Sequence, residues 1–136
     1  MKKINVLSNN ESTLEIHEDV RGLIADVFFA ASINHVALIR SEPFAERGNH
    51  YHKNSTQSIL ITKGSLEYWY KDSRSDSEPE MVIANVGDLI TSDPFEIHAL
   101  RILENGNEFI AFTEGQRGGA DYESDTFRVD SIFGKS

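Results

Sequence analysis

The sequence contains no cysteine. Without thiols, neither a disulfide framework nor a thiolate metal site can form, so any metal ion must be held by nitrogen and oxygen ligands. The sequence also lacks a run of about 18 apolar residues that could cross a membrane as a helix. No apolar segment of signal-peptide length follows Met1. These absences favour a cytoplasmic protein without a membrane partner.

Basic residues are few and scattered. The chain has 13 lysines and arginines against 22 acidic residues, which gives a formal net charge of −9. An acidic chain without a basic block argues against nucleic acid as a partner. A pocket inside such a protein can still be locally basic, and the candidate cations are Arg40, Arg47, Lys53, Lys63 and Arg101.

Long helical patterns are missing as well. No window of 12 or more residues has a clear 3.6-residue period. Short apolar or alternating runs predict strands instead, and many short strands indicate an all-β sandwich or barrel. The predicted strands are 21–30, 34–41, 57–62, 66–71, 81–86 and 88–91, followed by a hairpin of 98–103 and 108–113 around the Asn-Gly turn signal in 104–107.

The length of 136 residues fits one domain. We expect a single domain over residues 1–136, with its core at about 18–113 and a C-terminal tail at 114–136. The tail ends in the apolar pair Ile132 and Phe133. We expect it to pack on the exterior of the β structure or across a dimer interface.

Two histidines in one extended segment suggest the working site. His50 and His52 are two residues apart, and side chains at that spacing project from the same face of a strand. A third histidine, His98, opens another predicted strand. The sequence therefore predicts that three imidazoles meet in one cavity.

These histidines and the glycines around them resemble the two motifs of the cupin superfamily. Gly48, His50, His52, position 57 and Gly64 fit the first motif, and Gly87, Pro94 and His98 fit the second. The resemblance covers about residues 35–113. It implies a single-domain cupin, an all-β jelly-roll barrel also called a double-stranded β-helix.

The first motif departs from its usual form at Gln57, where cupins carry a glutamate. A neutral amide is a poorer ligand for a divalent transition metal than a carboxylate is. The resemblance therefore leaves two alternatives open. Either no cofactor is required, or His50, His52, Gln57 and His98 hold one Zn²⁺, Fe²⁺, Ni²⁺ or Mn²⁺ ion.

A closer resemblance concerns cupins that act on nucleotide-linked keto-sugars. Residues 47–53 (RGNHYHK) look like the motif of dTDP-sugar 3,4-ketoisomerases and of cupin domains in capsular-polysaccharide sugar epimerases. Residues 19–22 (DVRG) and 122–127 (YESDTF) are similar to the opening and the tail of such proteins. The resemblance implies an isomerase or epimerase of a nucleotide-linked 4-keto-6-deoxy-sugar, in the synthesis of surface polysaccharide or glycan sugars.

That reaction needs a base, because a proton next to the ketone must be removed. Histidine has a suitable pKa for this task. Carried over from the ketoisomerases, His50 is the first candidate for the catalytic base. His52 is expected to be a catalytic orienter or proton shuttle, or a metal ligand.

Substrate-binding candidates are aromatic or cationic. Tyr68 and Tyr70 share a strand face and offer rings for stacking on a nucleotide base. Arg47 and Lys53 flank the histidine motif and can hold a diphosphate. Arg40 and Arg101 lie within apolar strands and must pair or face a ligand.

Two other functions stay open. One is a metal-dependent cupin enzyme such as an Fe²⁺ dioxygenase, and the other is a non-catalytic cupin that binds a sugar or another small molecule. The partner expected from the resemblance is a small-molecule nucleotide sugar, with a second copy of the chain in a homodimer.

Overall fold

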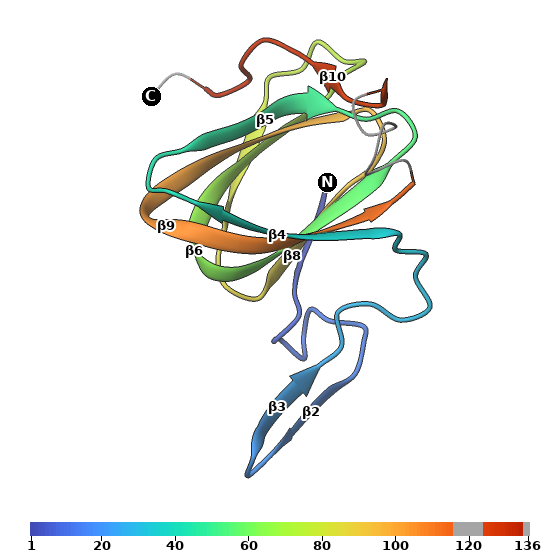
Figure 1. Ribbon diagram of the computed structural model, residues 1–136, viewed down its shortest axis with the longest axis vertical. Helices are drawn as coiled ribbons and strands as arrows, with labels where there is room; N and C mark the ends of the chain where they lie inside the picture. The colour runs from blue at the N-terminus through green and yellow to red at the C-terminus, as the bar shows by residue number, and fades with distance from the viewer. Residues whose placement is uncertain (116–123, 135–136) are drawn as a thin grey trace.

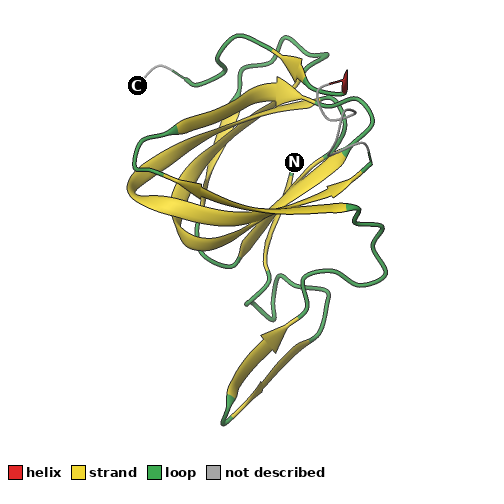
Figure 2. Cartoon of the chain, in the orientation of Figure 1, coloured by secondary structure: helices red, strands yellow, loops and turns green. Residues whose placement is uncertain are grey.

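The structure is a computed structural model that describes residues 1–115 and 124–134. Strands and loops make up nearly all of it (Figure 2). One sheet contains eight strands, in an order that curves into a barrel, and a separate hairpin projects from it (Figure 1). The strands are β1 (Lys2–Asn5), β2 (Ile16–Asp19), β3 (Gly22–Ala25), β4 (His35–Ser41), β5 (Glu46–Tyr51), β6 (Thr56–Asp72), β7 (Glu80–Ala84), β8 (Asp88–Ser92), β9 (Glu96–Glu114) and β10 (Phe127–Arg128).

Two long antiparallel strands, β6 and β9, run side by side through both walls of the barrel. β6 combines the two strands predicted at 57–62 and 66–71, with irregularities in register near Lys63 and Ser65. One half of the pair carries β4 and β8, and the other half carries β5 and β7. Both ends of β6 therefore lie at the same open mouth of the barrel, and its middle forms the far end.

The hairpin predicted around residues 104–107 does not form, because β9 continues through it. Asn-Gly hairpins of the common type need positive φ at both turn residues. Here Gly106 has a φ of 72°, and Asn105 is not among the residues with positive φ. The chain therefore bends at Gly106 and stays paired with β6 on both sides of the bend, so that it turns a barrel corner.

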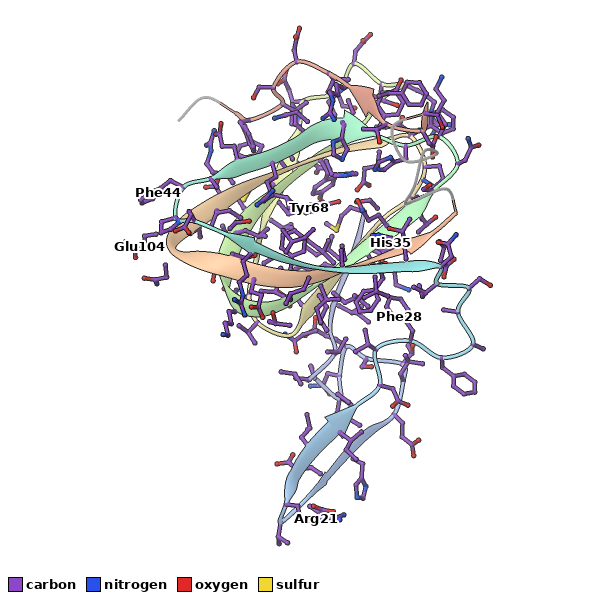
Figure 3. The ribbon with its side chains drawn as sticks, in the orientation of Figure 1. Arg21, Phe28, His35, Phe44, Tyr68 and Glu104 are labelled. Atoms are coloured by element: carbon purple, nitrogen blue, oxygen red, sulfur yellow. The ribbon has the colours of Figure 1, made fainter. Side chains whose placement is uncertain are left out.

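The strand predicted at 21–30 is shorter and lies elsewhere. Gly22–Ala25 pairs with β2 in a two-stranded sheet away from the barrel. Arg21 marks the tip of this hairpin in Figure 3. In place of the predicted strand, β1 joins the barrel by pairing with β8.

The core fills the barrel interior with branched and aromatic side chains. Ile61, Leu66, Ile90 and Ile102 are at most 1% exposed. They pack with further buried side chains of β6 and β9 in one cluster. Several of its members, including Ile59, Leu100 and Ala111, also line the cavity described below.

The described residues 129–133 of the C-terminal tail cover the outer wall at β5 and β9. Ile132 is buried with Ile97 and Ala99, and Phe133 packs edge-on against Trp69 at 6.2 Å between ring centroids. The tail thus packs on the barrel exterior, which is one of the two arrangements expected from its apolar end.

Candidate active site

Three imidazoles meet inside the mouth of the barrel. His50 comes from β5, His52 from the loop after it, and His98 from β9. The ring centroids lie 5.0 Å apart for His50 and His52, 4.7 Å for His50 and His98, and 5.5 Å for His52 and His98. One nitrogen of each ring lies within 4.8 Å of the others. The structure thus brings together the three histidines of the two sequence motifs.

A β-bulge aims the first histidine into the cavity. The register between β5 and β9 shifts between Gly48 and His50, and both Gly48 and Asn49 have positive φ. The inserted residue lets Arg47 and His50, three positions apart, both face inward. A side chain at Gly48 is excluded, because its Cβ would lie 2.6 Å from the carbonyl oxygen of His98.

The second histidine is oriented by the C-terminal tail. The Nδ1 atom of His52 lies 2.9 Å from the backbone carbonyl oxygen of Asp125. A carbonyl only accepts hydrogen bonds, so Nδ1 carries the proton. When the ring is neutral, its lone pair is therefore on Nε2. Nε2 is therefore the atom with which His52 can take up a proton or bind a cation.

The Asp125 carboxylate fixes the loop that carries His52. Asp125 is 2% exposed and accepts hydrogen bonds from the backbone amides of Lys53 and Asn54 and from the hydroxyl of Ser55. Asp125 belongs to the segment 122–127 that resembles the epimerase tail, but the sequence alone indicated no role for it. An acidic residue far from the histidines gave no signal that it would reach them.

The third histidine is held neutral. Burial, followed by the nearby charges of His50 and His52, lowers the pKa of His98 well below its ordinary value. A neutral imidazole offers a lone pair at physiological pH. His98 therefore cannot serve as a standing positive charge in the cavity.

A buried tyrosine supplies a hydroxyl beside the imidazoles. The ring of Tyr68 lies nearly parallel to that of His98 at 6.4 Å between centroids, in the barrel interior (Figure 3). Its hydroxyl hydrogen-bonds with Ser92 and donates to Glu96 at 3.3 Å. Burial and the charge of Glu96 raise the pKa of Tyr68 well above its ordinary value. The hydroxyl therefore keeps its proton and acts as a donor.

Glu96 itself is tied to the start of the chain. Its carboxylate lies 2.5 Å from the amino group of Met1. Burial raises the pKa of Glu96, and its contacts with the amino group oppose that shift. This ion pair lies beside the hydroxyls of Tyr68 and Ser92.

These groups surround a cavity of about 240 Å³. Its wall mixes apolar side chains of the core with a few polar groups. The polar lining consists of Arg47, His50, Gln57, Tyr68, Ser92 and His98. The volume lies just below the range of roughly 300–1,000 Å³ for sites of drug-sized ligands, so it suits one sugar ring.

Arg47 is the only predicted basic residue in the cavity lining that the structure describes. Its Nε donates to the hydroxyl of Ser41 at 2.7 Å, which leaves the guanidinium along the inner wall. Lys53 lies over the ring of Phe127 at the rim, 4.3 Å from its centroid. Both therefore stay close to the histidine cluster.

The other predicted binding residues lie farther away. Arg40 faces outward and pairs with Glu108 at 2.7 Å. Arg101 pairs with Glu46 and covers the ring of Phe133 on the outer wall. Tyr70 lies next to Tyr68, but it lines a neighbouring hollow with Met1 and Glu96. The arginines thus pair, as expected of charged residues on strands, without reaching the cavity.

The imidazole cluster fits a divalent metal ion by its chemistry. Three imidazole nitrogens within 4.8 Å of one another match the three-histidine sets of some zinc enzymes. The hydrogen bond from Nδ1 of His52 to the carbonyl oxygen of Asp125 is the kind of contact that orients a metal-binding histidine in other proteins. His50, His52 and His98 would hold the ion, which would polarise a bound carbonyl group.

Comparison by sequence gives no family. No family model matches the chain, and no curated protein matches it. The described residues also include no helix that is both long and apolar enough to span a membrane.

Comparison by structure gives clear neighbours. A mutant of the 3,4-ketoisomerase QdtA from Thermoanaerobacterium thermosaccharolyticum, solved with TDP-4-keto-6-deoxyglucose, has a TM-score of 0.71 at 15% identity over 94% of this chain and 86% of that chain. The TDP-quinovose 3,4-ketoisomerase WlaRB from Campylobacter jejuni has a TM-score of 0.72 at 19% identity, covering 94% and 92%.

An enzyme with a different activity, a 3,5-epimerase, is also similar in structure to this chain. The dTDP-4-dehydrorhamnose 3,5-epimerase from Sulfolobus tokodaii has a TM-score of 0.69 at 18% identity, covering 88% of this chain and 76% of that chain. At identities this low, a structural likeness establishes only the architecture. The chain therefore has the single-domain, all-β cupin fold that these nucleotide-sugar-modifying enzymes share.

Proposed function

We propose that the protein is an isomerase or epimerase of a nucleotide-linked 4-keto-6-deoxy-sugar. The observation that carries the proposal is the convergence of three imidazoles in a cavity of sugar-ring size. The shared architecture with 3,4-ketoisomerases and 3,5-epimerases supports it. The neighbour QdtA was solved with TDP-4-keto-6-deoxyglucose, so this compound is the first substrate to test.

In this proposal His50 removes the proton next to the ketone. His50 lines the cavity, and its neighbours His52 and His98 can pass the proton on or return it to another carbon. Negative charge then develops on the ketone oxygen. The hydroxyl of Tyr68 or Ser92, both in the cavity wall, then exchanges its present hydrogen bond for one donated to that oxygen.

The nucleotide is expected to lie outside the cavity, because the volume accommodates the sugar alone. Arg47 at the wall and Lys53 at the rim are the proposed diphosphate contacts. Arg40, Arg101 and Tyr70 would reach a substrate only through the part of the nucleotide that lies over the barrel exterior.

A homodimer and a cytoplasmic location belong to the same proposal. Large apolar side chains stand exposed on the β2–β3 hairpin and on the outer face of β4, where a second copy could cover them. They include Val20, Leu23, Ile24, Val36 and Leu38.

The test is proton exchange with solvent. Purified protein is incubated with TDP-4-keto-6-deoxyglucose in D₂O, with and without a chelator, and deuterium in the sugar is located by NMR. We expect deuterium at a carbon next to the ketone in both samples. Binding of the substrate without any exchange would overturn the proposal.

A metal-dependent cupin enzyme is the second candidate, favoured by the same three imidazoles. Elemental analysis of the purified protein separates the two. Stoichiometric iron, together with an absence of exchange, favours a dioxygenase. Substrate binding without either result favours the non-catalytic sugar-binding alternative.

A further inference from the structure

A row of polar side chains crosses the cavity wall formed by β4, β9, β6 and β8. His35 is paired with Thr113, Thr113 with Gln57, and Gln57 with Ser92. Residues directly opposite one another in an antiparallel sheet project from the same face. Gln57 and Ser92 line the cavity, and Thr113 and His35 continue the row from them on the same face of the sheet.

Thr113 is the most buried member of the row. It is 1% exposed, and it follows Phe109 and Ala111, two cavity-lining residues, at the two-residue spacing of one strand face. Its hydroxyl has no hydrogen-bond partner in the described part of the chain. The Nδ1 atom of His35 is likewise buried without a partner among those residues.

A buried hydroxyl without a partner destabilises the folded state. The next layer of the same wall is apolar, with Ala111, Ile59 and Ile90 at the corresponding positions. Valine has nearly the shape of threonine and would suit such a wall better. Packing within the described part of the chain therefore gives no reason for a hydroxyl at position 113.

We infer that Thr113 and Gln57 form a subsite that recognises a ring hydroxyl of the sugar, on a wall other than the one carrying His50 and His98. The inference rests on the proposed function. The hydroxyl of Thr113 and the amide of Gln57 are uncharged and can both donate and accept, which matches a neutral sugar hydroxyl and not a phosphate. Gln57 then acts as a substrate-binding residue, where the sequence suggested a metal ligand.

The first test is stability, which needs no ligand. Thr113→Val removes the unpartnered hydroxyl and keeps the shape, so we expect an unchanged or higher melting temperature. The matched control is Thr91→Val. The hydroxyl of Thr91 bonds with Ser58 at 2.9 Å on the other face of the sheet, so this variant should melt at a lower temperature.

The second test is discrimination between ligands. Affinities are measured for TDP-4-keto-6-deoxyglucose, for its counterparts without the C2 or the C3 hydroxyl, and for TDP alone. Wild type should bind one of the deoxy compounds about 3- to 10-fold more weakly than the parent sugar, the effect of one neutral hydrogen bond. Thr113→Val should lose that difference and bind TDP as wild type does, whereas Thr113→Ser should retain it.

The outcomes separate the two proposals. If wild type neither binds the keto-sugar nor exchanges its proton, the proposed function fails and the sugar subsite fails with it. If wild type exchanges normally, but Thr113→Val melts at a lower temperature and discriminates among the sugars as wild type does, only the subsite is overturned.

Discussion

His52 and Asp125 meet through a hydrogen bond of 2.9 Å, although they lie 73 positions apart in the chain. The backbone of Asp125 fixes the tautomer of the imidazole, and its carboxylate holds the loop on which the imidazole lies. The tail is therefore part of the site. It also covers the outer wall of the barrel.

Replacing Asp125 with asparagine should damage both stability and activity. Both carboxylate oxygens of Asp125 accept hydrogen bonds, and the NH₂ group of asparagine cannot accept one. We therefore expect a loss of about 1–3 kcal/mol in the free energy of unfolding. Urea unfolding measures the first effect and solvent proton exchange the second. Asp130→Asn, at an exposed position of the same tail, is the control. Equal behaviour of the two variants would contradict the role of Asp125.

Replacing His50 with alanine should remove the proposed base. A general base contributes about 10²- to 10⁴-fold in rate, and the rate of deuterium exchange should fall by that factor. His17→Ala is the matched control, because the side chain of His17 is 66% exposed on the β2–β3 hairpin. A His50→Ala variant that exchanges at more than a tenth of the wild-type rate would exclude His50 as the base.

The stability of the protein should depend on His98 in mildly acidic solution. Burial lowers the pKa of His98 in the folded state below its unfolded value of about 6.5. The unfolded chain then binds more protons at low pH, so the contribution of His98 is complete above pH 6.5 and is lost as the pH falls toward the folded pKa.

The measurement is the free energy of unfolding of wild type and His98→Asn from pH 8 downward to about pH 5. We expect the wild type to lose more stability over this range than the variant, which lacks the titrating ring. Parallel curves would contradict the prediction that folding lowers the pKa of His98.

Replacing Gly64 with alanine should disrupt the barrel corner. An added Cβ would lie 2.1 Å from the carbonyl oxygen of Gly106, where β6 and β9 bend together. Gly22→Ala is the control, because Gly22 also has positive φ but has open space around its Cβ position. We expect losses of more than about 3 kcal/mol for Gly64→Ala and about 1 kcal/mol for Gly22→Ala, measured by urea unfolding. Similar losses would mean that backbone strain alone matters at the corner.

The sequence by itself determined the β architecture and the identity of the three imidazoles. Alternation along β4 and β6 reports which residues face inward, because a strand has a period of two. The spacing of His50 and His52, with His98 at the start of another strand, was enough to predict their meeting. These features are local, so they can be recognised without knowing the pairing of strands.

Only the tertiary structure decided which other residues join the site. The bend at Gly106 continues a strand where the Asn-Gly pair indicated a hairpin, because pairing with β6 on both sides outweighs the local turn preference. Asp125 and Thr113 reach the site through contacts between segments distant in the chain. Such contacts depend on register and closure of the barrel, which no short stretch of sequence specifies.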